Sequence, residues 1–169
     1  MLSRLERSSR PSGVLRRLSD APSVSEPSGP APPPPPPAEG SIWWGRERFL
    51  SCSASGRHEP CPEVVDVTGP ERALVFGPYA SLEPGLWRAT AMFELCPDAA
   101  RRQLAVDFGA MPSFRVKEAP HQPGRHAIEL DYDVQPEDLV EVRLLIRTAG
   151  FHGEVRFLGA LLERLGDVR

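Results

Sequence analysis

Residues 126–146 have the sequence HAIELDYDVQPEDLVEVRLLI, and its alternation of apolar and charged side chains decides the fold class. Successive side chains of a strand point to opposite faces, so an apolar residue at every second position is typical of a half-buried strand. Residues 135–138, QPED, interrupt the pattern with turn-forming side chains. We therefore predict two strands joined by a turn. Their apolar positions are Ile128, Leu130, Tyr132 and Val134, then Val140, Val142, Leu144 and Ile146.

The charged positions of these two strands predict a register. A hairpin centred on Glu137 would set Asp131 opposite Arg143, a favourable pair contributing about 0.2–1 kcal/mol. The same register sets Asp133 against Glu141, a like-charge pair that is tolerable beside a solvated turn. We expect this hairpin to present its charged side chains to solvent.

The same alternation recurs along residues 41–169. Further runs cover residues 87–95, 104–108 and 155–161, and turn signals rich in Pro, Gly and Asp separate them at intervals of about ten residues. Many short strands between evenly spaced turns predict an all-β fold, an antiparallel β-sandwich with a jelly-roll-like arrangement. Alternation does not give the pairing of strands, so an immunoglobulin-like strand order stays open.

Residues 1–40 have a different composition. They contain the proline run 32–37, with isolated prolines before it, and few large apolar side chains. Such a segment buries too little surface to offset the entropy of ordering. We predict a disordered, basic and Pro-rich N-terminal tail and linker over residues 1–40, followed by a β-sandwich domain over residues 41–169.

Charge and cysteine usage exclude several classes of protein. The net charge is -3, and residues 41–169 are mildly acidic, which argues against a nucleic-acid partner. No stretch approaches the roughly 20 apolar residues of a membrane span, and the N-terminus has no apolar core of a secretory signal. The three cysteines fit a reducing compartment. We expect a cytoplasmic protein without a transmembrane segment.

Residues 73–95, ALVFGPYASLEPGLWRATAMFEL, resemble a passage of galactose-binding-like jelly rolls and related carbohydrate-binding modules. In that passage a Pro/Gly turn precedes a strand that opens with an aromatic and a basic residue. Residues 154–163 are similar to the last strand of that fold, which lies beside the first. The resemblance implies a β-sandwich that binds glycans through exposed aromatic side chains, in some members with a structural calcium.

Three aromatic residues are candidate glycan platforms. Trp43 and Trp44 are adjacent, so within a strand they point to opposite faces, and one of them could be exposed. Tyr79 lies in the Gly-Pro-Tyr stretch before a predicted turn. Trp87 occupies a core position of its predicted strand, and we interpret it as packing.

Two polar groupings invite a chemical interpretation. Cys52, His58 and Cys61 lie in one segment and could ligate zinc with Cys96 or His121 as fourth ligand, or form a Cys–His nucleophile pair. The close cysteine spacing of structural zinc sites and any oxyanion-hole signature are missing, so we interpret them as ordinary side chains and expect no cofactor. Glu129, Asp131 and Asp133 would project about 7 Å apart from one strand face. We interpret this carboxylate row as a solvated face rather than an acid/base pair or a calcium site.

These observations favour a non-catalytic binding or accessory module that recognises carbohydrate or serves glycan-processing proteins. The alternative is a protein–protein interaction or scaffolding module tethered by the Pro-rich tail. A small hydrolase or metal enzyme built on the Cys52, His58 and Cys61 segment is a third interpretation. The expected partner is therefore a glycan or another protein.

Overall fold

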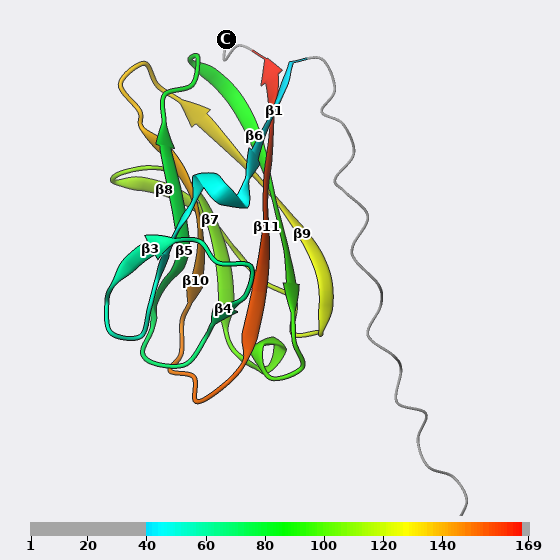
Figure 1. Ribbon diagram of the computed structural model, residues 1–169. Helices are drawn as coiled ribbons and strands as arrows, with labels where there is room; N and C mark the ends of the chain where they lie inside the picture. The colour runs from blue at the N-terminus through cyan, green and yellow to red at the C-terminus, as the bar shows by residue number, and fades with distance from the viewer. Residues whose placement is uncertain (1–39, 167–169) are drawn as a thin grey trace, which may run out of the picture. The chain divides into compact units, whose positions relative to one another are not determined.

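The computed structural model describes residues 40–166, which form eleven β-strands and two short 3-10 helices (Figure 1). Apart from Gly40, the predicted tail lies outside the described residues. No helix within residues 40–166 is long and apolar enough to cross a membrane. The strands are β1 (Ser41–Gly45), β2 (Leu50–Cys52), β3 (His58–Pro60), β4 (Val65–Asp66), β5 (Arg72–Ala80), β6 (Gly85–Leu95), β7 (Leu104–Ala110), β8 (Ser113–Glu118), β9 (Gly124–Val134), β10 (Val140–Ile146) and β11 (Glu154–Gly166), and the 3-10 helices are η1 (Arg46–Arg48) and η2 (Ala99–Arg101).

The strands form two antiparallel sheets, which confirms the predicted all-β sandwich. A five-stranded sheet has the order β1-β11-β6-β9, with β4 also pairing β11, and a six-stranded sheet has the order β3-β2-β5-β10-β7-β8. Four strand pairs are nested along the chain, as in a long hairpin rolled up across two sheets. They are β1·β11, β5·β10, β6·β9 and β7·β8. This nesting is the jelly-roll strand order and not the immunoglobulin one. The last strand lies beside the first.

The predicted hairpin of residues 126–146 is wrong. Strand β9 belongs to the five-stranded sheet and β10 to the six-stranded sheet, so the connection between them crosses from one layer to the other. Asp131 faces Arg88 of β6, and Arg143 faces Asp107 of β7. Alternation identifies the buried face of each strand, but two such faces can meet across a core as well as lie side by side in one sheet.

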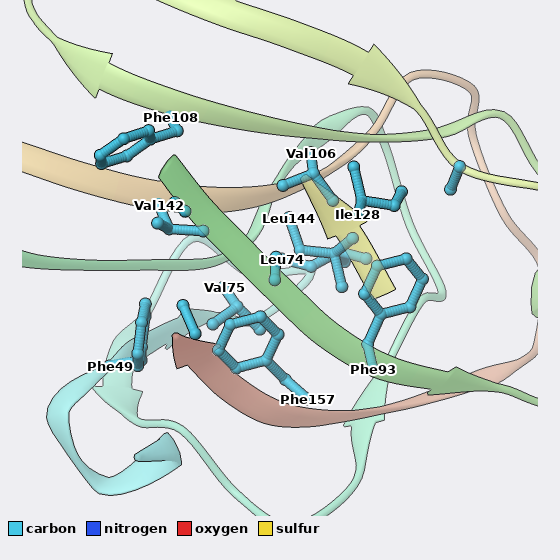
Figure 2. Close-up of a cluster of buried hydrophobic side chains, with 14 of the residues drawn as sticks. Phe49, Leu74, Val75, Phe93, Val106, Phe108, Ile128, Val142, Leu144 and Phe157 are labelled. Atoms are coloured by element: carbon cyan, nitrogen blue, oxygen red, sulfur yellow. The ribbon is translucent and has the colours of Figure 1, made fainter. Parts of the chain in front are cut away.

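The core lies between the two sheets. Figure 2 shows Phe93 and Phe157 of the five-stranded sheet near Leu74 and Leu144 of the six-stranded sheet. All four side chains are buried, and each such burial stabilises the fold by roughly 1.5–3 kcal/mol. Trp87 is buried as predicted, and its indole Nε1–H donates to a backbone carbonyl at 2.8 Å.

Candidate functional site

One row of residues, each paired with the next across neighbouring strands, crosses all six strands of the six-stranded sheet. Its members point away from the core, because their neighbours on β10, Val142 and Leu144, point into it (Figure 2). An ion pair stands at the centre of the row and apolar side chains flank it. From β3 to β8 the row is Pro60, Leu50, Phe76, Arg143, Asp107 and Val116.

The central pair is bidentate, with Asp107 buried and Arg143 half-buried. Arg143 Nε donates to Asp107 Oδ1 at 2.8 Å, and Nη2 donates to Oδ2 at 2.6 Å. The guanidinium also lies 3.8 Å from the ring centroid of Phe114 on β8, which is cation–π distance. Hydrogen bonding to Asp107 raises the pKa of Arg143 above its ordinary value. These contacts fix the guanidinium in one orientation on the sheet.

Glu141 lies two residues from Arg143 on β10, and therefore on the same face. The residue is only 4% exposed. Its Oε1 is 3.8 Å from Arg143 Nη1, while Oε2 is buried without a hydrogen-bond partner among the described residues. Burial raises the pKa of this carboxyl, and Arg143 and the hydroxyl of Tyr79 counteract the rise in part. A buried acceptor without a donor is unfavourable and is a feature that needs an explanation.

Two hollows meet at this ion pair. The first, of ≈ 260 Å³, is lined by Tyr79, Phe76, Glu141 and Arg143 and by Cys52 and His58; we call it the Tyr79 hollow. The second, of ≈ 380 Å³, extends from Arg143 and Asp107 towards Phe114 and Val116. Arg143 lines both hollows, so they adjoin on one surface. Small-ligand sites have volumes of about 300–1,000 Å³, so the second hollow lies at the lower end of this range and the first just below it.

Tyr79 stands at the edge of its hollow in a rare backbone conformation. It follows the cis peptide bond Gly77–Pro78 and has φ = 58°. The residue is 51% exposed. Its ring packs edge to face against that of Phe76, with 6.4 Å between the ring centroids. Burial and the nearby Glu141 raise the pKa of its hydroxyl. A left-handed conformation at a non-glycine residue is uncommon and is enriched at functional sites.

The two tryptophans point to opposite sides of β1, as predicted. Trp44 is 1% exposed, so neither face of its indole is open to a ligand. Trp43 is half-buried and lies against Gly159 of β11, where an added Cβ would come within 2.7 Å of its ring. Trp43 therefore remains a candidate platform on the five-stranded sheet, apart from the hollows of the other sheet.

The cysteine and histidine candidates do not form a metal site. Cys52 faces His58 across β2 and β3, and both line the Tyr79 hollow, but Cys61 is buried. Burial raises the pKa of the Cys61 thiol to about 11, which makes it a poor nucleophile. Cys96 lies beside η2, and His121 is exposed. Within residues 40–166, no group of three His, Cys, Asp or Glu side chains is placed to hold a metal ion.

The predicted carboxylate row lies on the outer face of the five-stranded sheet. Arg88 donates two hydrogen bonds to Asp131, at 2.7 and 2.9 Å, and lies 3.6 Å from Glu129. These carboxylates are thus partly neutralised by a basic side chain on the adjacent strand. Asp133 lies on the same strand nearer its end.

Sequence reasoning missed the groups at the centre of the site. Glu141 and Arg143 were assigned to a solvated strand face, and Asp107 was not singled out. A signal was present, because Asp107 is the only charged residue in LAVDFGA, the seven residues of β7. All seven are buried, so the strand is covered on both faces. A charge in such a strand is a buried charge.

Comparison of the chain with protein-family models, curated proteins and solved structures found no match. The function is therefore argued from the site itself, since one fold hosts many functions.

Proposed function

We propose that the sandwich is a non-catalytic binding module that recognises carbohydrate on the outer face of the six-stranded sheet. The observation that supports this is the exposed ring of Tyr79 beside an oriented set of charged groups, the buried Glu141 and Asp107 and the half-buried Arg143. A cytoplasmic accessory role beside glycan-processing proteins belongs to the same proposal.

The two kinds of group match the two kinds of surface on a sugar. A sugar ring carries hydroxyls, which donate and accept hydrogen bonds, on a framework of C–H groups. Carboxylate oxygens accept from hydroxyls and a guanidinium donates to them, and charge-assisted bonds of this type are the stronger ones. An aromatic ring supplies a large apolar surface for the C–H face. The Tyr79 hollow offers both within ≈ 260 Å³.

The geometry favours binding over glycoside hydrolysis. Hydrolysis generally needs two carboxyl groups free to flank the scissile bond, one as an acid and one as a base or nucleophile. Asp107 accepts three hydrogen bonds from Arg143 and is 1% exposed, which leaves it unable to take the second role. Of these two carboxylates, Glu141 alone is then left to accept a hydrogen bond from a sugar.

The test is binding of the full chain to a glycan array, with calorimetry on each hit. Tyr79→Ala should weaken binding about tenfold or more, because it removes the apolar surface. Phe151→Ala is the matched control, since Phe151 is an exposed aromatic on the β10–β11 connection and lines neither hollow. It should bind as the wild type does.

Two results would contradict the proposal. One is a blank array for a chain that unfolds cooperatively. The other is a hit that Trp43→Ala abolishes and Tyr79→Ala leaves unchanged, which would move the site to the five-stranded sheet.

Exposed apolar side chains favour the protein–protein alternative as a second candidate. Tyr79, Leu139 and Met111 are exposed at adjacent ends of β5, β10 and β7. An apolar group of this kind suits a protein partner. A purified partner whose affinity falls for Leu139→Asp and for deletion of residues 1–40, with no sugar bound, would favour this function.

A further inference from the structure

We infer that the Tyr79 hollow selects neutral and amino sugars and rejects acidic ones, with Glu141 as the group that discriminates. The inference rests on the proposed function and specifies its ligand class. A neutral sugar would offer a hydroxyl to Glu141 and an amino sugar an ammonium group, whereas a uronic acid or sulfated sugar would bring a second anion.

The first step is the charge in the hollow. Tyr79, Arg143 and Asp107 act on Glu141, and His58 and Cys52 line the same hollow. Arg143 is the basic group nearest to Glu141, and its hydrogen bonds go to Asp107 at 2.6, 2.8 and 3.1 Å. Its approach to Glu141, at 3.8 Å, is too long for a hydrogen bond. The positive charge is thus matched to Asp107, and an ionised Glu141 leaves the hollow negative.

The second step is the unused acceptor. Glu141 Oε2 is buried and has no hydrogen-bond partner within residues 40–166. The hydroxyl of Tyr79 is a donor beside this carboxylate, which lines an open hollow. Leaving a buried acceptor unpaired lowers the stability of the ligand-free protein, and a ligand donor at this atom would remove that cost. Functional groups are often kept at such an expense to stability.

The third step is discrimination against anions. An acidic ligand in the hollow would place its charge against Glu141 in a partly desolvated site, where like charges repel strongly. Arg143 offsets this only in part, because its Nε and Nη2 donate to Asp107 and its remaining nitrogen, Nη1, lies beside Glu141. An ammonium group in the same place would instead be attracted to Glu141.

The experiment measures binding of the full chain to three matched series of hexose ligands. Each series, based on glucose, galactose or mannose, contains the neutral sugar, its free 2-amino form and its uronic acid. In a series whose neutral member binds, we expect the uronic acid to bind at least about tenfold more weakly and the amino sugar equally or more tightly.

Glu141→Gln tests whether this residue is responsible. The change keeps the side-chain shape and removes the charge, so the uronic-acid penalty should shrink at least about threefold. Because the buried charge of Glu141 is gone, the ligand-free variant should melt at the same temperature as the wild type or higher. Glu129→Gln, an exposed carboxylate on the other sheet, is the matched control and should leave the selectivity unchanged.

The possible failures are distinguishable. Uronic acids that bind as tightly as neutral sugars overturn this inference and leave the proposed function standing. A lower melting temperature for Glu141→Gln in the ligand-free chain also overturns it, because the carboxylate would then be structurally satisfied. If no member of any series binds and the glycan array is blank, the proposed function fails and the inference falls with it. If the array gives a hit outside these series, only the inference fails.

Discussion

The outer faces of the two sheets carry the same cross-strand pair in different surroundings. On the five-stranded sheet Arg88 Nε lies 2.7 Å from Asp131 Oδ1, and on the six-stranded sheet Arg143 Nη2 lies 2.6 Å from Asp107 Oδ2. The exposed fractions of the side chains are 35% and 42% in the first pair but 24% and 2% in the second. Identical residue types therefore form a solvated surface on one face and the centre of a candidate site on the other.

The difference in burial changes what each pair contributes. Water and salt screen an exposed pair, so it adds little to stability. A buried pair interacts more strongly, but the cost of removing both charges from water offsets much of the gain. Its members nevertheless depend on each other, because loss of one leaves the other uncompensated. Removing single partners is therefore the sharpest way to compare the faces.

The largest expected effect is that of Asp107→Ala. Breaking a buried ion pair from one side costs about 3–5 kcal/mol, and since Arg143 is partly exposed we expect about 3 kcal/mol. The free energy of unfolding in urea measures it. Asp131→Ala, the equivalent change on the other sheet, should cause a much smaller loss. Equal losses for the two variants would show that burial does not distinguish the pairs.

A smaller effect is expected for Arg143→Lys. Lysine keeps the charge but loses the bidentate geometry with Asp107 and the planar contact with Phe114. The loss of one charge-assisted hydrogen bond should cost about 1–2 kcal/mol in the free energy of unfolding. Arg88→Lys, on the solvated face, serves as the control. If lysine is tolerated equally at both positions, the guanidinium geometry of Arg143 has no structural role.

The sequence predicts which side chains face outward better than it predicts which of them meet across strands. Alternation identified which residues of β9 and β10 face inward, because side-chain period is a property of a single strand. It placed Glu141 and Arg143 outward correctly. It could not show that Arg143 meets Asp107, because residues 107 and 143 are brought together by the nesting of strands far apart in the chain.

Burial of an outward-facing charge was also beyond the sequence pattern. Glu129 and Glu141 both alternate with apolar residues, yet the first is exposed and the second is buried. The difference comes from neighbours on other strands, including Tyr79 at the end of β5. Of the predicted platforms, only Tyr79 lines either hollow on the six-stranded sheet. Its left-handed backbone gave no signal in the sequence beyond the preceding Gly-Pro.

The pH dependence of stability should differ in sign between two carboxyls on opposite faces. Burial raises the pKa of Glu141 above its ordinary value of 4.5, so the folded state holds this proton more tightly and stability falls as pH rises from about 4.5. Hydrogen bonding to Arg88 lowers the pKa of Asp131 below 3.8, so its contribution is present above that pH and is lost as pH falls below it.

Urea unfolding between pH 2.5 and 8 tests both signs. Relative to the wild type, Glu141→Gln should flatten the fall in stability above about pH 4.5, and Asp131→Asn should flatten the fall below about pH 3.8. A wild-type curve that Glu141→Gln leaves unchanged would mean that burial does not perturb this carboxyl.

The smallest expected effect is the response of the two pairs to salt. The Debye length falls to about 3 Å at 1 M ionic strength, which screens charges in solvent far more than buried ones. The small loss in the free energy of unfolding for Asp131→Ala should therefore disappear in 1 M NaCl, while the loss for Asp107→Ala should persist. Each variant is compared with the wild type at the same salt concentration, which removes the general effect of salt on folding. If both losses disappear, water reaches the Arg143–Asp107 pair as freely as it reaches Arg88–Asp131, and the site then lacks the desolvated centre on which selection between neutral and acidic ligands depends.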